Sequence, residues 1–172
     1  YEHLADAEEM IVILNTPHEI QDIPKAKKLV VSKKKIEFKN VYFGYPENQS
    51  VLENFNLIIK PNERLALIGP SGAGKSTIIK LLLRMHDINK GKILIDDQDI
   101  SKVTQESLWE NVSLVPQDPI LFHKSLMENI RYGKPQATDK EVILAAKAAH
   151  CNEFISGLAK GYDTYVGERG IK

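Results

Sequence analysis

The stretch of sequence that decides the fold is LALIGPSGAGKSTIIKLLLRM, residues 65–85. It opens with the continuous apolar run Leu65–Ile68, which is typical of a strand buried on both faces of a mainly parallel sheet. A glycine-rich turn follows, and Lys75–Met85, rich in Ile and Leu, has the composition of a buried helix. A buried strand, a glycine turn and a buried helix in this order predict an α/β domain.

The glycine turn Gly69–Thr77 matches the pattern G-x-x-x-x-G-K-[ST] of the phosphate-binding loop, or Walker A motif. Glycine lets the backbone wrap closely around phosphates, and the free N–H groups at a helix start favour negative charge. The Lys75 ammonium suits the β- and γ-phosphates, and the Ser76 hydroxyl suits Mg²⁺. The alternative is a glycine-rich turn followed by an incidental lysine. We favour nucleotide binding, because the motif stands between an apolar strand and an apolar helix. The loop residues predicted to bind the nucleotide are Gly69, Ser71, Gly72, Ala73, Gly74, Lys75, Ser76 and Thr77.

Other segments extend the alternation of strands and helices. Apolar residues at helical spacing predict a helix over residues 1–14, and Thr138 with Glu141 forms a capping-box pattern that opens another helix. The lysine-rich stretch 25–39 has two interpretations: a solvated linker, which we favour, or a segment that contacts acidic lipid headgroups. Short strands are predicted at Ile36–Val41, Leu57–Lys60, Ile93–Ile95 and Val112–Val115.

The composition excludes some classes of protein. Lys plus Arg and Asp plus Glu both number 23, and this neutral balance argues against nucleic acid as a partner. The single cysteine, Cys151, favours a reducing compartment. No apolar run approaches the length of about 18 residues that crosses a bilayer. A connection to a membrane would therefore come through a partner or through sequence outside these 172 residues.

Several polar and aromatic residues are assigned structural roles. The five histidines show no metal-ligand spacing, so surface or capping roles are expected for them. Asp96, Asp97 and Asp99 follow a short predicted strand and are expected to form a polar turn. Trp109 is expected to be a packing residue.

Four stretches together resemble the nucleotide-binding domain of exporter-type ABC transporters. They are VYFGYPENQSVLENFNLIIKPNERLALIGPSGAGKSTIIKLLLR at 41–84, GKILIDDQDI at 91–100, VSLVPQDPILFHKSLMENIRYG at 112–133 and YDTYVGERG at 162–170. Residues 1–23 also resemble the segment that links an exporter's last membrane helix to its ATPase domain.

This resemblance implies a P-loop NTPase core with a mixed or parallel sheet plus an antiparallel β subdomain. It divides the chain into a helical extension and linker at 1–33 and the N-terminal part of an ABC ATPase domain at 34–172. The implied cofactors are ATP and Mg²⁺. The implied partners are a transmembrane domain and a second nucleotide-binding domain, at the cytoplasmic face of a membrane.

The resemblance also implies roles for single residues. Tyr45 matches the aromatic that stacks on adenine, although by itself it would pass for a turn residue before Pro46. Gln117 matches the glutamine that contacts Mg²⁺ and the attacking water, so Lys75 and Gln117 are the predicted catalytic residues, with Ser76 and Gln117 at the metal. Residues 120–133 and 165–170 resemble the parts of an exporter that face its membrane domain.

The 172 residues do not contain the LSGGQ-type signature, the acidic pair that supports Mg²⁺ and activates water, or the switch histidine of the family. We therefore expect a fragment that ends just before the signature motif. It would be hydrolytically inactive alone and part of an ATPase at full length. Two alternatives stay open: a non-catalytic nucleotide-binding module, and a cytosolic P-loop kinase.

Overall fold

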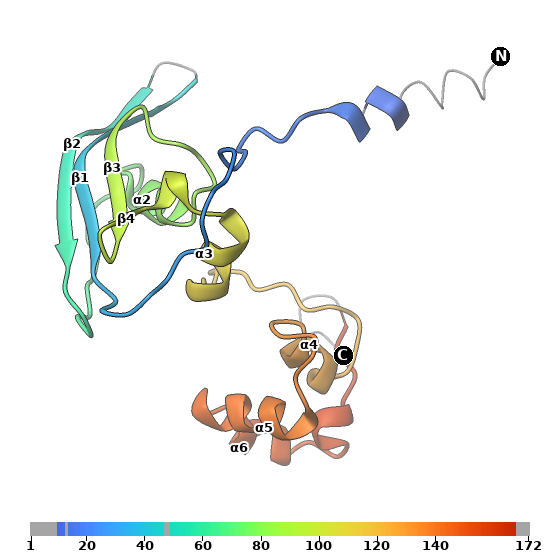
Figure 1. Cartoon of the computed structure of the whole chain (residues 1–172). Coiled ribbons are helices and arrows are strands. Elements are labelled where there is room, and N and C mark those ends of the chain that lie inside the picture. The colour runs from blue at the N-terminus through green and yellow to red at the C-terminus, as the bar shows by residue number, and fades with distance from the viewer. Residues whose placement is uncertain (1–9, 13, 47–48, 168–172) are drawn as a thin grey trace. The chain divides into compact units, whose positions relative to one another are not determined.

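The computed structural model describes residues 10–12, 14–46 and 49–167. The chain divides into two compact units, residues 1–113 and 114–172 (Figure 1). Each unit is described by itself.

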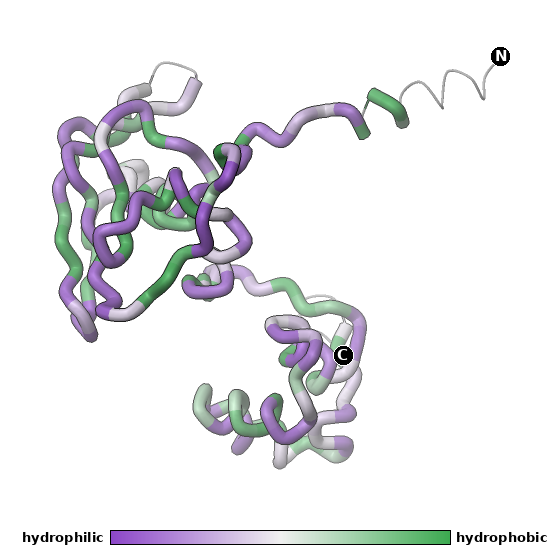
Figure 2. Tube along the Cα trace, viewed as in Figure 1, coloured by the Kyte–Doolittle hydropathy of each residue, from purple (hydrophilic) through white to green (hydrophobic). Residues whose placement is uncertain are grey.

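The first unit contains one four-stranded antiparallel sheet in the order β2-β1-β3-β4. Its central strand, β1 (Ile36–Tyr45), pairs with β2 (Gln49–Ile59) on one side and with β3 (Lys90–Ile95) on the other. The short β4 (Gln98–Asp99) closes the edge beside β3. Apolar and polar residues alternate along the strands (Figure 2), so one face of the sheet is available for a core.

The core of this unit lies between the sheet and helix α2 (Lys75–Leu82) (Figure 1). Phe38 of β1 pairs with Ile93 of β3, and both side chains are buried in one cluster with Leu81 of α2. The helix ends where Arg84 takes a left-handed backbone conformation with φ of 50°. The predicted helix therefore stops before Met85, because a residue with positive φ does not continue a right-handed helix.

The prediction of an α/β fold with an antiparallel part is confirmed, and three of the predicted strands coincide with parts of β1, β2 and β3, although Lys60 lies just beyond the end of β2. The two others are wrong. Leu65–Ile68 forms no strand: Ile68 is 95% exposed. Val112–Val115 forms none either. Among the described residues no segment pairs with either run, and a strand exists only where a neighbour supplies its hydrogen bonds. The sheet seen here is thus antiparallel, with no parallel strand pair among the described residues.

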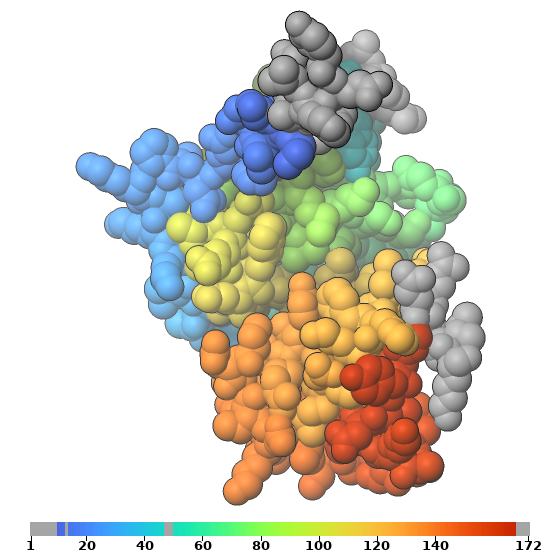
Figure 3. Space-filling model, turned by 90° about the vertical axis from the view of Figure 1, so that its right-hand side faces the viewer, coloured from blue at the N-terminus to red at the C-terminus, as the bar shows by residue number. Residues whose placement is uncertain are grey.

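The segment before β1 is fastened to this unit by hydrogen bonds to its backbone. Leu29 is buried in the core, and its N–H donates to Ser107 Oγ at 2.9 Å. Gln98 bonds both the N–H and the carbonyl of Val30, at 3.1 and 2.6 Å. Lys27 forms a parallel bridge with Val103, beside the short 3₁₀ helix η1 (Ile100–Lys102) and α3 (Gln105–Asn111). In Figure 3 the yellow surface of this region adjoins the blue surface of the segment.

Asp96 supplies the last of these attachments. Its carboxylate accepts the backbone N–H groups of residues 32–35, at distances between 2.7 and 3.1 Å. Partial desolvation raises the pKa of Asp96, but these four amide donors outweigh it and hold the pKa well below its ordinary value of 3.8. The carboxylate thus organises the turn that enters β1, as expected for a polar turn. The predicted domain boundary at residues 33 and 34 stays a prediction.

The second unit is helical. It contains α4 (Leu126–Arg131), α5 (Asp139–Ala148), α6 (Asn152–Ser156) and the 3₁₀ helix η2 (Gly161–Asp163). The predicted capping box of Thr138 and Glu141 opens α5, and a second one, formed by Ser125 and Glu128, opens α4. Buried apolar residues of this unit come from α5, with Val142 and Ala146, and from α6, with Ile155.

Residues 10–12, 14 and 15 are helical, and the remainder of the predicted helix 1–14 lies outside the described residues. None of the helices in the described ranges combines the length and the apolarity needed to span a membrane.

Candidate nucleotide-binding site

The glycine loop turns directly into the first residue of α2. Gly72 and Gly74 have φ of 81° and 80°, in the left-handed region that favours glycine, and Gly74 is the N-cap of the helix. A Cβ on Gly74 would lie 3.1 Å from the side chain of Val51 in β2, so the loop also passes close to the sheet. The N-cap makes no side-chain hydrogen bond, and the first N–H groups of a helix have no partner within the helix, so donors are available where the loop joins α2.

The Lys75 ammonium is held within the loop. Its Nζ donates to the carbonyls of Gly69, at 2.8 Å, and Pro70, at 2.6 Å. The loop is tightened by a further bond from the Ala73 N–H to the Pro70 carbonyl. Within the described part of the chain no carboxylate forms an ion pair with Lys75, so its ammonium places a positive charge beside the helix N-terminus.

A pocket of about 750 Å³ opens in front of this loop. Its walls are Ser71–Thr77 together with Tyr45, Ser50 and Val51. Gly69 is not among the residues that line the pocket, but its carbonyl accepts a hydrogen bond from Lys75 Nζ. The fold therefore brings Tyr45, at the end of β1, to the same pocket as the loop. The Tyr45 hydroxyl lies 3.3 Å from Thr77 Oγ1, so the phenol ring is tied to the first turn of α2.

Ser76 is exposed and lines the pocket, so its hydroxyl is free to face a bound ion. A hydroxyl oxygen belongs to the class of oxygen ligands that Mg²⁺ prefers. Among the described residues no group of three His, Cys, Asp or Glu gathers as a metal site.

Gln117, the other residue predicted at the metal, belongs to the second unit and is exposed. Its approach to the loop stays a prediction.

Two side chains that pack against Tyr45, those of Phe43 and His86, were not predicted from the sequence to lie near the site. The rings of Phe43 and His86 lie with their centroids 5.0 and 5.4 Å from that of Tyr45, both nearly perpendicular to it. A surface or capping role is expected for His86 from the sequence, and it is instead half-buried in this cluster. The alternation of β1 places Phe43 and Tyr45 on one face, but nothing in the sequence pattern points to His86.

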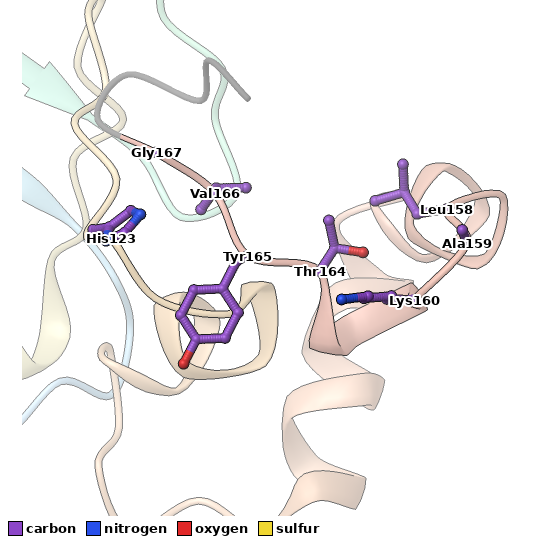
Figure 4. Close-up of a pocket in the computed structure, with 8 residues that line it drawn as sticks. All are labelled: His123, Leu158, Ala159, Lys160, Thr164, Tyr165, Val166 and Gly167. Atoms are coloured by element: carbon purple, nitrogen blue, oxygen red, sulfur yellow. The ribbon is translucent and has the colours of Figure 1, made fainter.

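The second unit contains a separate pocket of about 430 Å³. Figure 4 shows His123 and Val166 on one side of it and Lys160 and Thr164 on the other. The hydroxyl oxygen of Thr164 is buried and has no hydrogen-bond partner among the described atoms.

The loop, the helix behind it and the antiparallel sheet are the parts expected of an ABC-type nucleotide-binding domain, and comparison with known proteins agrees. The family model described as "ABC transporter" matches residues 52–168, more than half of the chain. The chain therefore belongs to the ABC transporter family, and its resemblance to the exporter type is confirmed by the relatives that follow.

Mouse ATP-binding cassette sub-family B member 6 is 47% identical over 97% of this chain, which corresponds to 20% of the mouse protein. The ATM1-type heavy metal exporter of Novosphingobium aromaticivorans is 46% identical over 98% of this chain and 28% of its own length. A solved structure of a bacterial Atm1-family ABC exporter with ATP bound is similar with a TM-score of 0.89 and 46% identity, over 98% of this chain and 30% of that one. The chain thus spans less than a third of each of these proteins.

Proposed function

We propose that the Gly69–Thr77 loop binds ATP with Mg²⁺, and that in the full-length protein this ATPase powers export of a substrate across a membrane. One observation carries the proposal: the loop with the Lys75 ammonium and the Tyr45 ring line a single pocket at the N-terminus of α2. Cationic and amide donors at one end and a flat ring at the other match a triphosphate joined to a nucleobase.

The residues divide the recognition of ATP between them. The loop N–H groups and the Lys75 ammonium bind the β- and γ-phosphates and neutralise their charge. To do so, Nζ exchanges its bonds with the Gly69 and Pro70 carbonyls for phosphate oxygens. Ser76 would hold Mg²⁺, which when bound neutralises charge on the phosphates. Tyr45 offers its face to adenine, and in the proposed catalytic state Gln117 orients the attacking water.

The remaining parts of the proposal concern the whole protein. Relatives named as exporters support a transmembrane domain as partner and a position at the cytoplasmic face of a membrane. A second nucleotide-binding domain is the other expected partner, since its signature motif would complete the site. Hydrolysis in the family also needs an acidic pair and a switch histidine that these 172 residues do not contain. We therefore expect the 172 residues alone to bind ATP but not to hydrolyse it.

Isothermal titration calorimetry with Mg-ATP and with Mg-tripolyphosphate tests the binding site. Lys75→Ala should weaken both ligands at least about tenfold, because each uses the same phosphate contacts. Tyr45→Ala should weaken ATP by roughly 5- to 100-fold, the range for a base stacked on an aromatic ring, and leave tripolyphosphate unchanged. Lys80→Ala is the matched control, since Lys80 is exposed on the same helix and does not line the pocket. Wild-type affinity in Lys75→Ala would exclude this site.

A hydrolysis assay tests the catalytic part. Phosphate release by the 172 residues should stay at the background rate, and a C-terminally extended version should release phosphate. Equal turnover in both would show that the extra residues are not needed.

A further inference from the structure

Three rings of the first unit meet beside the nucleotide pocket. Phe43 and Tyr45 lie on β1, and His86 follows the C-terminal turn of α2. The His86 ring lies 5.4 Å from Tyr45, nearly perpendicular to it, and 5.8 Å from Phe43, tilted by 37°. The imidazole therefore contacts both aromatic residues at once.

These contacts reach Tyr45 from outside the pocket. Tyr45 lines the pocket, whereas Phe43 and His86 do not. Its hydroxyl is held in addition by Thr77 Oγ1 at 3.3 Å. A phenol ring that packs against two other rings and is bonded through its hydroxyl has less freedom to rotate, while part of the residue lines the pocket.

Two further bonds hold the turn that contains His86. Arg84, whose side chain is 3% exposed, pairs with Asp87 through Nε at 3.1 Å, so an ion pair spans His86. The N–H of Met85 donates to the Lys80 carbonyl at 2.9 Å, which attaches the same turn to α2. The residues on both sides of His86 are thus attached to the end of α2 by these two bonds.

We propose that His86 is a positioning residue for Tyr45: its imidazole holds the phenol ring at the angle that stacks on the base, and so contributes to affinity for the nucleobase but not for the phosphates. This inference rests on the proposed function. Its physical basis is that an edge-to-face aromatic contact restricts a side chain before the ligand arrives, and a preordered ring loses less entropy on binding.

The test compares three variants of the purified protein by calorimetry with Mg-ATP and Mg-tripolyphosphate. His86→Leu replaces the imidazole by an aliphatic side chain of similar size and so removes the ring. His86→Phe restores a ring. His18→Ala is the control, since His18 is an exposed histidine remote in sequence from the pocket residues and does not line it. A thermal melt of each variant checks that it is folded.

We expect His86→Leu to weaken Mg-ATP by roughly two- to tenfold, the equivalent of one aromatic pair, and to leave Mg-tripolyphosphate unchanged. His86→Phe should recover wild-type affinity for ATP. Unchanged ATP affinity in His86→Leu, equal weakening of both ligands, or failure of His86→Phe to recover would each overturn the inference. Failure of the wild type to bind ATP would instead refute the proposed function, and the two results are distinguished by the wild-type titration alone.

Discussion

Replacing Arg84 by methionine should destabilise the first unit by about 2–4 kcal/mol, the range expected when a buried, paired arginine loses its charge and its donors. The guanidinium makes four hydrogen bonds: to the carbonyls of Val103 and Gln21, and to the carboxylates of Asp22 and Asp87. The introduced thioether side chain would keep the aliphatic volume but none of these donors, so packing changes little and the loss is mainly polar.

The size of this loss in stability depends on which hydrogen-bond partners of Arg84 water can reach in the variant. The buried Val103 carbonyl loses a charged donor, and such a bond contributes roughly 1.5–3 kcal/mol, whereas Gln21 is an exposed residue whose carbonyl water can reach. The carboxylates of Asp22 and Asp87 keep 36% and 51% of their side chains exposed, so water solvates them again and each ion pair adds at most about 1 kcal/mol. The desolvation that burying the guanidinium requires is removed in the variant and lowers the sum.

Trp109 makes this measurable, because it is the only tryptophan and its Nε1 donates to the Leu83 carbonyl at 2.9 Å, next to Arg84. Urea unfolding followed by tryptophan fluorescence gives the free energy of unfolding of this unit. Arg64→Met is the matched control, since Arg64 is exposed, and it should change stability by less than about 0.5 kcal/mol. An Arg84→Met variant within the same margin of wild type would refute the reasoning.

Two further predictions concern stability, one for each unit. Gly91→Ala should lower the melting temperature markedly, because Gly91 has φ of 95° and a Cβ there would overlap the backbone of Asn40 in β1; an unchanged melting curve would contradict the close approach of β1 and β3. The bond from the Lys134 ammonium, with bonds from Thr138, lowers the pKa of Glu141 from 4.5 to about 2. A carboxyl group whose pKa is lowered by folding stabilises the fold at pH values above its ordinary pKa. This stabilisation is lost as the pH falls towards the lowered pKa. The stability advantage of wild type over Glu141→Gln should therefore be full above pH 4.5 and fade towards pH 2, as melts at several pH values would show, and a difference independent of pH would contradict it.

Local patterns predicted much of what the structure shows. The phosphate-loop motif and the capping box at Thr138 depend on residues close together in the chain, whose backbone conformations follow from glycine and from side-chain caps. Both are present, with positive φ at Gly72 and Gly74 and both reciprocal bonds at the cap. Three strands were also recognisable, because short apolar segments bounded by turn residues are typical of strands.

The same local reasoning was wrong at Leu65–Ile68. An apolar run predicts burial, but whether it becomes a strand depends on a neighbour's hydrogen bonds, which are not encoded in the run itself. Val112–Val115 was wrong for the same reason.

By itself, then, the sequence determined the loop, the helix that follows it and the family to which the chain belongs, because these depend on short motifs read in order. Only the tertiary structure decided that Tyr45 meets the loop in one pocket, that His86 lies behind it and that Arg84 joins the segment before β1 to the end of α2. Arg84 and Gln21 are 63 positions apart, and His86 and Tyr45 are distant along the chain as well. Contacts of this kind arise when the sheet and α2 bury a shared core, and no local pattern specifies them.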